Sequence, residues 1–275
     1  DMNFSMVQMQ AKTFDTMLEM TASFSPDENP GKTLKLIIKE TNTNTIVGFI
    51  RFGSPLINSK PRNDYLGGVP DLEIFNKRAI MGFNIVPIQP FGYNYLGGKL
   101  LAMLCCTHEV REILNKKYDA NICHFETTSL YGSNSMYNGI PYWHRCGKSA
   151  GKIAIKPDDS AYFVWADWLK ENHREEFDKA QNQTGPKQNT IARIFKHLGI
   201  KGKEYEHGFH RGVFFANMYE NGSEYLRKEI KEKELVMKPK FENDIDYIMN
   251  WWKPKAIRRY VKLYENNRIK PEILI

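Results

Sequence analysis

Long apolar runs and paired cysteines are both scarce in this sequence of 275 residues. Its most apolar window, 100–106, is much shorter than the roughly 18 residues of a membrane-spanning helix. No basic segment followed by an apolar one stands at the N-terminus. The four cysteines, Cys105, Cys106, Cys123 and Cys146, have no C-x-x-C spacing. These absences exclude a transmembrane span and a disulfide scaffold, and they predict a cytoplasmic protein with free thiols and no metal site.

Apolar residues and basic residues are what the chain does have. With 41% hydrophobic and 13% aromatic residues, it can build one large or two ordinary domains. The formal net charge is +7, and residues 251–270 carry seven basic side chains against Glu265 alone. Aromatic residues interleave with these charges, which predicts a helix that contacts nucleic-acid phosphates. A solvated helix that docks its aromatic side chains on the core is the alternative. The candidate nucleic-acid-binding residues are Lys253, Lys255, Arg258, Arg259 and Lys262.

Turn chemistry at Lys156-Pro157-Asp158-Asp159 predicts a boundary between a domain of residues 1–156 and a mainly helical basic extension of residues 157–275. The extension includes a predicted helix over 189–200, ended by Gly199, whose rhythm is similar to the first half of a helix-turn-helix. In the first domain, periodicity predicts a hairpin of strands 33–40 and 45–52, a strand over 79–88, a helix from Tyr95 to Lys117, a strand over 120–127, a short helix over 135–142 and a strand over 147–155.

This order of elements places a glycine-bearing turn between a strand and the start of a helix, where backbone amides and the helix dipole favour anions. The order resembles the GNAT superfamily of acyl-CoA-dependent N-acyltransferases. The resemblance implies an α/β (α+β) fold with a mixed, largely antiparallel sheet and packed helices. It also implies that the turn holds the pyrophosphate of acetyl-CoA or another acyl-CoA. The matching cofactor-binding residues are Gly92, Asn94, Gly97, Gly98 and Lys99.

A more specific resemblance spans about residues 45 to 156. Six short segments, in order, are similar to the motifs of the DruA-like family of the Druantia anti-phage system and of transposon and phage proteins. They are Arg62–Gly67, Phe83–Pro87, Asn94–Ala102, Phe125–Thr127, Gly132–Trp143 and Gly147–Gly151. The phage DNA-modification protein Mom, also GNAT-like, is similar before its last strands. The resemblance implies a role in phage defence or in DNA modification.

The candidate catalytic residues are Glu126 and Tyr137. At a strand end, a carboxylate such as Glu126 can act as a general base or hold an exocyclic amine. The alternative is that Glu126 caps a loop or pairs with Arg51 or Arg62. By resemblance to GNAT enzymes, Tyr137 donates a proton to the leaving thiolate, and its alternative is half-buried packing with a satisfied hydroxyl.

Five residues near these two are candidates for substrate binding. Arg62 and Asp64 lie in a long loop, and loops of that length in compact domains are often functional. Trp143, with its aromatic neighbours, could stack on a base, although core packing explains it as well. The full set is Arg62, Asp64, Tyr131, Ser135 and Trp143.

Three functions remain open from the sequence. The first is a phage- or defence-related protein that acts on nucleic acid, most readily DNA, and transfers an acyl-type group onto a base or another amine. The second is a non-catalytic nucleic-acid-binding or inhibitory protein on a GNAT fold that has lost its cofactor. The third is a small-molecule N-acyltransferase. Binding of acetyl-CoA and salt-dependent binding of DNA would separate the three.

Overall fold

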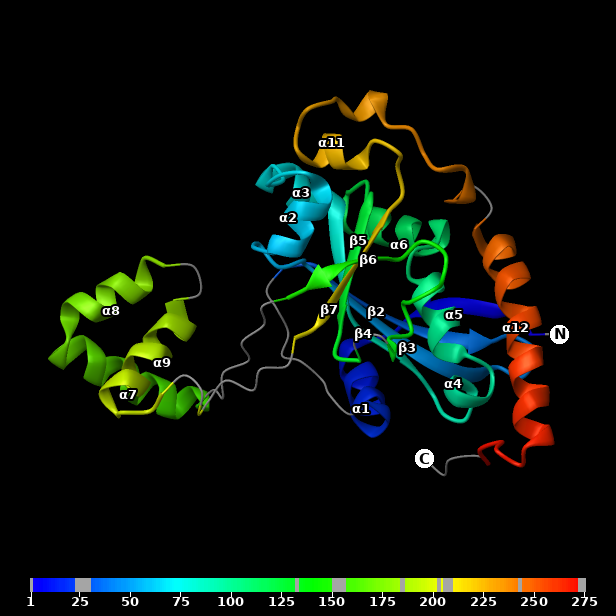
Figure 1. Ribbon diagram of the computed structural model, residues 1–275, viewed down its shortest axis with the longest axis horizontal. Helices are drawn as coiled ribbons and strands as arrows, with labels where there is room; N and C mark the ends of the chain where they lie inside the picture. Colours follow the sequence, from blue (N-terminus) through cyan, green and yellow to red (C-terminus); the bar gives the residue numbers. More distant parts are fainter. Residues whose placement is uncertain are drawn as a thin grey trace. The chain divides into compact units, whose positions relative to one another are not determined.

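The structure is a computed structural model, and it describes residues 2–22, 31–131, 134–149, 157–183, 186–201, 204, 210–241 and 244–271. The chain forms two compact units: the sheet unit, residues 1–149 with 211–275, and the helical unit, residues 150–210. This division differs from the predicted boundary at residue 156, because strand β7 (Gly212–Asn217) joins the sheet from within the predicted extension. The helical unit is therefore an insertion between two strands of one sheet (Figure 1).

In the described residues, seven strands form one sheet in the order β1-β2-β3-β4-β5-β7-β6. All neighbouring strands are antiparallel except the parallel pair of β4 and β5. This topology confirms the predicted fold class, an α/β fold with a mixed and largely antiparallel sheet. The strands other than β7 are β1 (Phe4–Gln8), β2 (Thr33–Glu40), β3 (Thr45–Gly53), β4 (Ala79–Pro87), β5 (His124–Ser129) and β6 (His144–Lys148).

The predicted hairpin is present as β2 and β3, which pair from Thr33 opposite Gly53 to Glu40 opposite Thr45. The Glu40 carboxylate closes the connecting turn, where it accepts hydrogen bonds from both the backbone N–H and the hydroxyl of Thr43, each at 2.8 Å. Side chains that alternate along β2 serve both faces of the sheet. The hairpin therefore contributes to two layers of packing rather than one.

Helices cover both faces of this sheet (Figure 1). Helix α1 packs Phe14 and Leu18 against Ile37 and Phe49, while α5 and α6 pack on the face that carries Phe52 and Phe125. Long helix α12 lies against α4 and α5. The helices of the sheet unit are α1 (Ala11–Thr21), α2 (Lys60–Leu66), α3 (Leu72–Arg78), α4 (Phe91–Asn94), α5 (Gly97–Leu104), α6 (His108–Tyr118), α11 (Gly222–Leu226), α12 (Asp244–Glu265) and the 3-10 turns η2 (Glu232–Glu234) and η3 (Pro239–Phe241).

Three predicted elements differ in the structure. The helix predicted from Tyr95 to Lys117 is two helices, because α5 ends at Leu104 and Thr107 starts a new one. The Thr107 hydroxyl caps α6 by accepting a hydrogen bond from the Val110 N–H at 3.3 Å. The short helix predicted over 135–142 is a run of turns, in which Gly139 and Tyr142 take φ of 66° and 74°. The strand predicted over 147–155 is β6, which starts earlier, and residues 150–156 lie outside the described residues.

The helical unit consists of α7 (Asp159–Asn172), α8 (Arg174–Gln181) and α9 (Pro186–His197). The predicted helix over 189–200 is confirmed as α9, which begins earlier and ends at His197, two residues before Gly199, where φ is 72°. The Ile200 N–H donates to the Phe195 carbonyl at 2.8 Å and closes this end. Among the helices of the described ranges, none has both the length and the apolar character needed to cross a bilayer.

Candidate functional site

Three ionisable side chains meet in the interior on one face of the sheet. Glu126 Oε2 lies 3.6 Å from Nη1 of Arg62 and 3.6 Å from Nε2 of His124, and all three residues are buried. His124 and Glu126 share this face because alternate residues of a strand point the same way. Arg62 reaches them from α2. The contact between Arg62 and Glu126 is the pairing that the sequence offered as the alternative to a catalytic role for Glu126.

Arg62 also fastens the loop that precedes its own helix. Its Nη1 and Nη2 donate hydrogen bonds to the carbonyls of Leu56 and Ile57 at 2.5 and 2.6 Å. Its guanidinium lies 4.2 Å from the centre of the Phe75 ring. Burial lowers the pKa of Arg62, and the nearby carboxylate of Glu126 works in the opposite direction. Arg62, predicted to bind substrate, is thus enclosed and clamps a loop onto the sheet.

The predicted acid and base do not meet. Thr127 follows Glu126 and points to the opposite face, where its hydroxyl lies 3.5 Å from the hydroxyl of Tyr137. The Tyr137 ring packs between Trp143 and Phe214 at 5.3 and 5.1 Å, and burial raises the pKa of its hydroxyl far above the usual range. Glu126 and Tyr137 therefore lie on different faces of the sheet.

The other predicted substrate residues are also dispersed. Trp143 is buried and donates its indole N–H to the Ala102 carbonyl at 2.6 Å. Ser135 is buried and its hydroxyl accepts from the Tyr137 N–H at 3.4 Å. Asp64 is exposed and pairs with Lys60 at 2.6 Å, and Tyr131 is 72% exposed. Two of these residues belong to the core and two to the surface, so they line no common site.

The turn predicted to hold a cofactor is filled by the chain itself. The Asn94 side chain is buried; its Nδ2 donates to the Lys270 carbonyl and its Oδ1 accepts from the Lys270 N–H, both at 3.0 Å. Lys99 donates from Nζ to the Asn138 carbonyl at 2.6 Å, and burial lowers its pKa. A Cβ added to Gly98 would lie 3.0 Å from Sδ of Met136. Asn94 and Lys99 are thus both engaged, and Met136 crowds the start of α5.

The two remaining glycines of the turn are there for packing. A Cβ on Gly97 would lie 2.5 Å from the Phe91 ring, and a Cβ on Gly92 would lie 2.9 Å from Cγ of Pro87. Both contacts are closer than a real Cβ tolerates. A side chain at either position would collide with Phe91 or Pro87. The two predicted cofactor-binding residues with functional side chains, Asn94 and Lys99, are bonded to the chain itself and so do not fit an acyl-CoA pyrophosphate as they stand.

Helix α12 covers the same turn. Arg259 donates from Nε to the Tyr93 carbonyl at 2.6 Å, and the rings of Tyr260 and Tyr95 stack with centroids 4.9 Å apart and planes 8° apart. The indole N–H of Trp252 donates to the Leu96 carbonyl at 3.4 Å. The segment predicted to bind nucleic acid and the turn predicted to bind a cofactor are therefore in contact.

The outer side of α12 carries the other predicted cations. Lys255, Arg258 and Lys262 are exposed, whereas Lys253 and Arg259 are half-buried. Beside the three exposed cations, the same helix exposes a line of apolar side chains. They are Ile257, Val261 and Tyr264, which are 63%, 46% and 70% exposed. One side of α12 docks aromatic residues on the core, as the second alternative predicts, and the other side presents positive charge to solvent. Contact with nucleic-acid phosphates stays a prediction.

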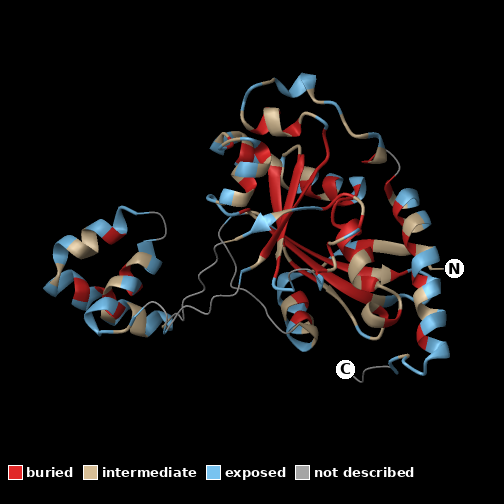
Figure 2. Ribbon diagram, viewed as in Figure 1, coloured by how far each residue is buried: buried red, intermediate tan, exposed pale blue. Residues whose placement is uncertain are grey.

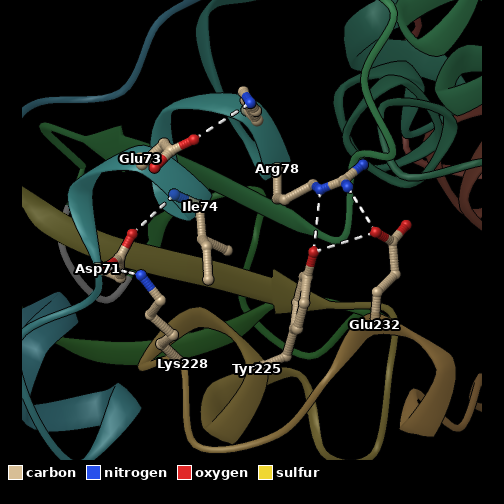
Figure 3. A network of polar contacts seen from close by, with 8 residues as sticks. Asp71, Glu73, Ile74, Arg78, Tyr225, Lys228 and Glu232 are labelled. Carbon is tan, nitrogen blue, oxygen red and sulfur yellow. Dashed lines mark hydrogen bonds and ion pairs between the residues drawn. The ribbon is translucent and has the colours of Figure 1, made fainter.

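A polar network that sequence reasoning missed ties α3 to the chain after β7 (Figure 3). Arg78 donates to the Tyr225 hydroxyl at 3.1 Å and pairs with Glu232 at 2.6 Å. Lys228 pairs with Asp71, whose carboxylate caps α3 at the Ile74 N–H. The partners are about 150 positions apart, so no local signal could have revealed them. Their contacts hold the segment after β7 against α3.

Within the described ranges, no three His, Cys, Asp or Glu side chains gather as metal ligands would. Among solved structures, the chain is similar to a tandem GNAT protein from the clavulanic acid biosynthesis pathway, without AcCoA, at 11% identity and a TM-score of 0.28. That match covers 98% of this chain and 88% of the other.

Similarity in sequence is more informative. The chain is 24% identical over 248 residues to the Druantia protein DruA of Escherichia coli strain UMEA 4076-1. The match covers 83% of this chain and 61% of that protein, so the chain matches less than two thirds of the length of this relative. The family described as Druantia protein DruA matches residues 4–228, which include the sheet strands and the helical unit. The chain belongs to the DruA family.

Proposed function

We propose that this chain is a DNA-binding protein of a Druantia-type anti-phage system, that it acts in the bacterial cytoplasm, and that it works without acyl-CoA. The observation that carries the proposal is the docking of α12. Its inner side covers the turn that a GNAT enzyme would offer to its cofactor, through Arg259 and the chain around Lys270. Its outer side exposes positive charge. Both features favour the non-catalytic alternative.

The exposed cations of α12 have the spacing of a phosphate-binding surface. Lys255, Arg258 and Lys262 follow one another at intervals of three and four residues, so they share one side of the helix. Cations that neutralise DNA phosphates release condensed counterions, and each such contact adds about 0.9 to the slope of log affinity against log salt. Three contacts from this side would contribute a slope of about 2.7. Such binding is strong at low salt and independent of sequence.

Group transfer has less support because its predicted parts are separated. A general base and a general acid must reach the same reacting groups, but Glu126 and Tyr137 lie on opposite faces of the sheet. The donor would need Asn94 and Lys99, and both are bonded to carbonyls of the chain. This second argument applies equally to the small-molecule acyltransferase.

The experiment is a titration of a labelled DNA duplex by fluorescence anisotropy at several salt concentrations. We expect the variant with Lys255→Ala, Arg258→Ala and Lys262→Ala to reduce the slope by about 2 to 3 and to weaken binding to every sequence alike. The matched control removes three exposed lysines from α1, α3 and α6, as Lys12→Ala, Lys77→Ala and Lys116→Ala. An equal effect of both triple variants would show that only net charge matters and would overturn the proposal for α12.

A thermal-shift titration tests the absence of the cofactor. A ligand that binds the folded state raises the melting temperature, so the duplex should stabilise the protein and acetyl-CoA should not. Stabilisation by acetyl-CoA would contradict the proposal and favour the two acyltransferase hypotheses. Under the proposal without a cofactor, nucleosides from cells with and without the protein should have the same mass spectrum.

A further inference from the structure

The helical unit has an interior of its own. Figure 2 shows buried positions on the sides of α7, α8 and α9 that face one another, with exposed residues outside. Leu169 of α7, Ala180 of α8 and Ile191 of α9 are all buried. The rings of Trp165 and Phe195 pack at 6.0 Å. The insertion is therefore a small three-helix bundle.

Its last two helices are connected as in a helix-turn-helix. Four residues of sequence, 182–185, separate the end of α8 at Gln181 from the start of α9 at Pro186, and Gly185 is among them. Short, glycine-containing connections of this kind are typical of that motif. Gln181 donates to the hydroxyl of Thr190 at 3.1 Å, and Glu176 pairs with His197 at 3.2 Å. The α8–α9 pair is thus fastened near both ends of α9, and α9 is the second helix of the pair.

Charge is divided unequally within this bundle. Residues 158–181 contain seven acidic and three basic side chains, whereas residues 186–201 contain four basic and no acidic ones. The net charges are therefore −4 for α7 with α8 and +4 for α9 with its end. A polyanion is attracted to the α9 side and repelled by the other two helices. This polarity gives the bundle one preferred direction of approach to nucleic acid.

The outer side of α9 carries residues suited to reading base edges. Gln188, Ala192 and Lys196 are exposed and follow one another every four residues. Asn189 and Arg193, half-buried, lie next to this line. Amide side chains pair with adenine and Arg or Lys with guanine in the major groove, while a small side chain such as Ala admits the thymine methyl. The surface combines these groups with no carboxylate.

We propose that α9 is a recognition helix that enters the major groove of double-stranded DNA, with Gln188, Asn189, Ala192, Arg193 and Lys196 toward the bases. This rests on the proposed function only in that both require DNA. The two surfaces would act differently: α12 binds phosphates of any sequence, and α9 selects among sequences. A recognition helix also contacts the backbone with its cations, which fix its register.

The experiment selects preferred duplexes from a random pool with the full-length chain, and then measures affinity for the selected and for a scrambled duplex. Ala192→Glu places a carboxylate in the centre of the reading surface at an exposed position that does not contribute to the interior. We expect it to reduce affinity for the selected duplex by about tenfold or more and to remove the preference over the scrambled one. Asn172→Glu adds the same charge at an exposed position of α7 and should preserve the preference.

A second pair of variants separates reading from charge. Arg193→Ala should relax the preference at one or two base pairs, whereas Lys170→Ala on α7, with the same loss of charge, should not. If the wild-type chain binds duplexes without preference and Ala192→Glu has no effect, the recognition helix is refuted while DNA binding by α12 stands. If the chain binds no duplex, or only RNA, both proposals fall. A normal helical circular dichroism spectrum of each variant keeps loss of folding apart from loss of recognition.

Discussion

The two basic helices of this protein are held in different ways. Helix α12 uses part of its charge for packing, since Arg259 donates to the Tyr93 carbonyl and Trp252 lies among Phe4 and Phe91. In helix α9, Lys187 pairs with Asp159 at 2.5 Å, and Arg193 donates to the Asn189 carbonyl of the same helix at 3.2 Å. Its remaining cations and amides lie at or near the surface. The difference shows that positive charge in a sequence is available for a binding surface only where packing does not use it.

The two helices also depend on different parts of the protein for their stability. The buried side of α9 packs within the small helical unit, while the buried side of α12 packs within the sheet unit. A bundle of this size buries little apolar area and is marginal in stability. Truncation of a buried side chain of α9 should therefore unfold the helical unit. Truncation of a buried side chain of α12 should lower the stability of the sheet unit.

The largest effect is expected from Phe195→Ala. Phe195 is 7% exposed, and removing a buried phenylalanine side chain costs about 3–5 kcal/mol. That loss is comparable to the whole stability of a small domain. We expect limited proteolysis to cut within residues 157–201 while the thermal transition of the sheet unit remains. Sequence preference on DNA should disappear, and the salt-dependent binding should stay.

The control for this variant is Leu198→Ala, which truncates an apolar side chain that is 59% exposed at the end of α9. It should leave the helical unit resistant to protease. A single unfolding transition, at a lower temperature for the sheet unit and the helical unit together, would show that the two units do not unfold independently.

The next effect in size is expected from Trp252→Ala. Trp252 is 1% exposed, and its loss should lower the free energy of unfolding of the sheet unit by about 3–5 kcal/mol in a denaturant titration. Tyr264→Ala, on the exposed side of the same helix, should change it by no more than about 0.5 kcal/mol. Sequence preference on DNA should survive both substitutions. Equal losses from the two would mean that α12 does not dock on the turn through its inner side.

Local patterns in the sequence were sufficient for much of the fold. The alternation in residues 33–53 predicts β2 and β3 almost to the residue, and the periodicity of residues 189–200 predicts α9. Strand β7 could not be assigned to the sheet in the same way, because its partner β5 is about 90 positions away and an insertion separates it from β6. Local periodicity identifies an element but not its neighbours.

The candidate site was less predictable for a similar reason. Glu126 and Thr127 are adjacent in sequence, yet one contacts the Arg62 side of the sheet and the other contacts Tyr137 on the opposite side. Motif order along a chain cannot distinguish these faces unless the strand and its register are known. The pairing of Asn94 with the backbone of Lys270 spans 176 positions and has no signature in either segment.

The smallest of the three effects, and the one that sharpens the role of α12, is expected from Asn94→Ala. The substitution removes two part-buried hydrogen bonds to the Lys270 backbone. Each contributes about 0.5–1.5 kcal/mol, so we expect the free energy of unfolding to fall by about 1–3 kcal/mol. Lys270→Ala retains the same backbone bonds and should change the free energy of unfolding by less than about 0.5 kcal/mol. The decisive measurement is acetyl-CoA binding by calorimetry for both variants. Because Lys99 and Met136 still fill the start of α5, neither variant should bind it. Binding gained only by Asn94→Ala would mean that the chain around Lys270 blocks a cofactor site that is otherwise able to bind acetyl-CoA. The segment that follows α12 would then regulate acetyl-CoA binding, which is a role that α9 does not have.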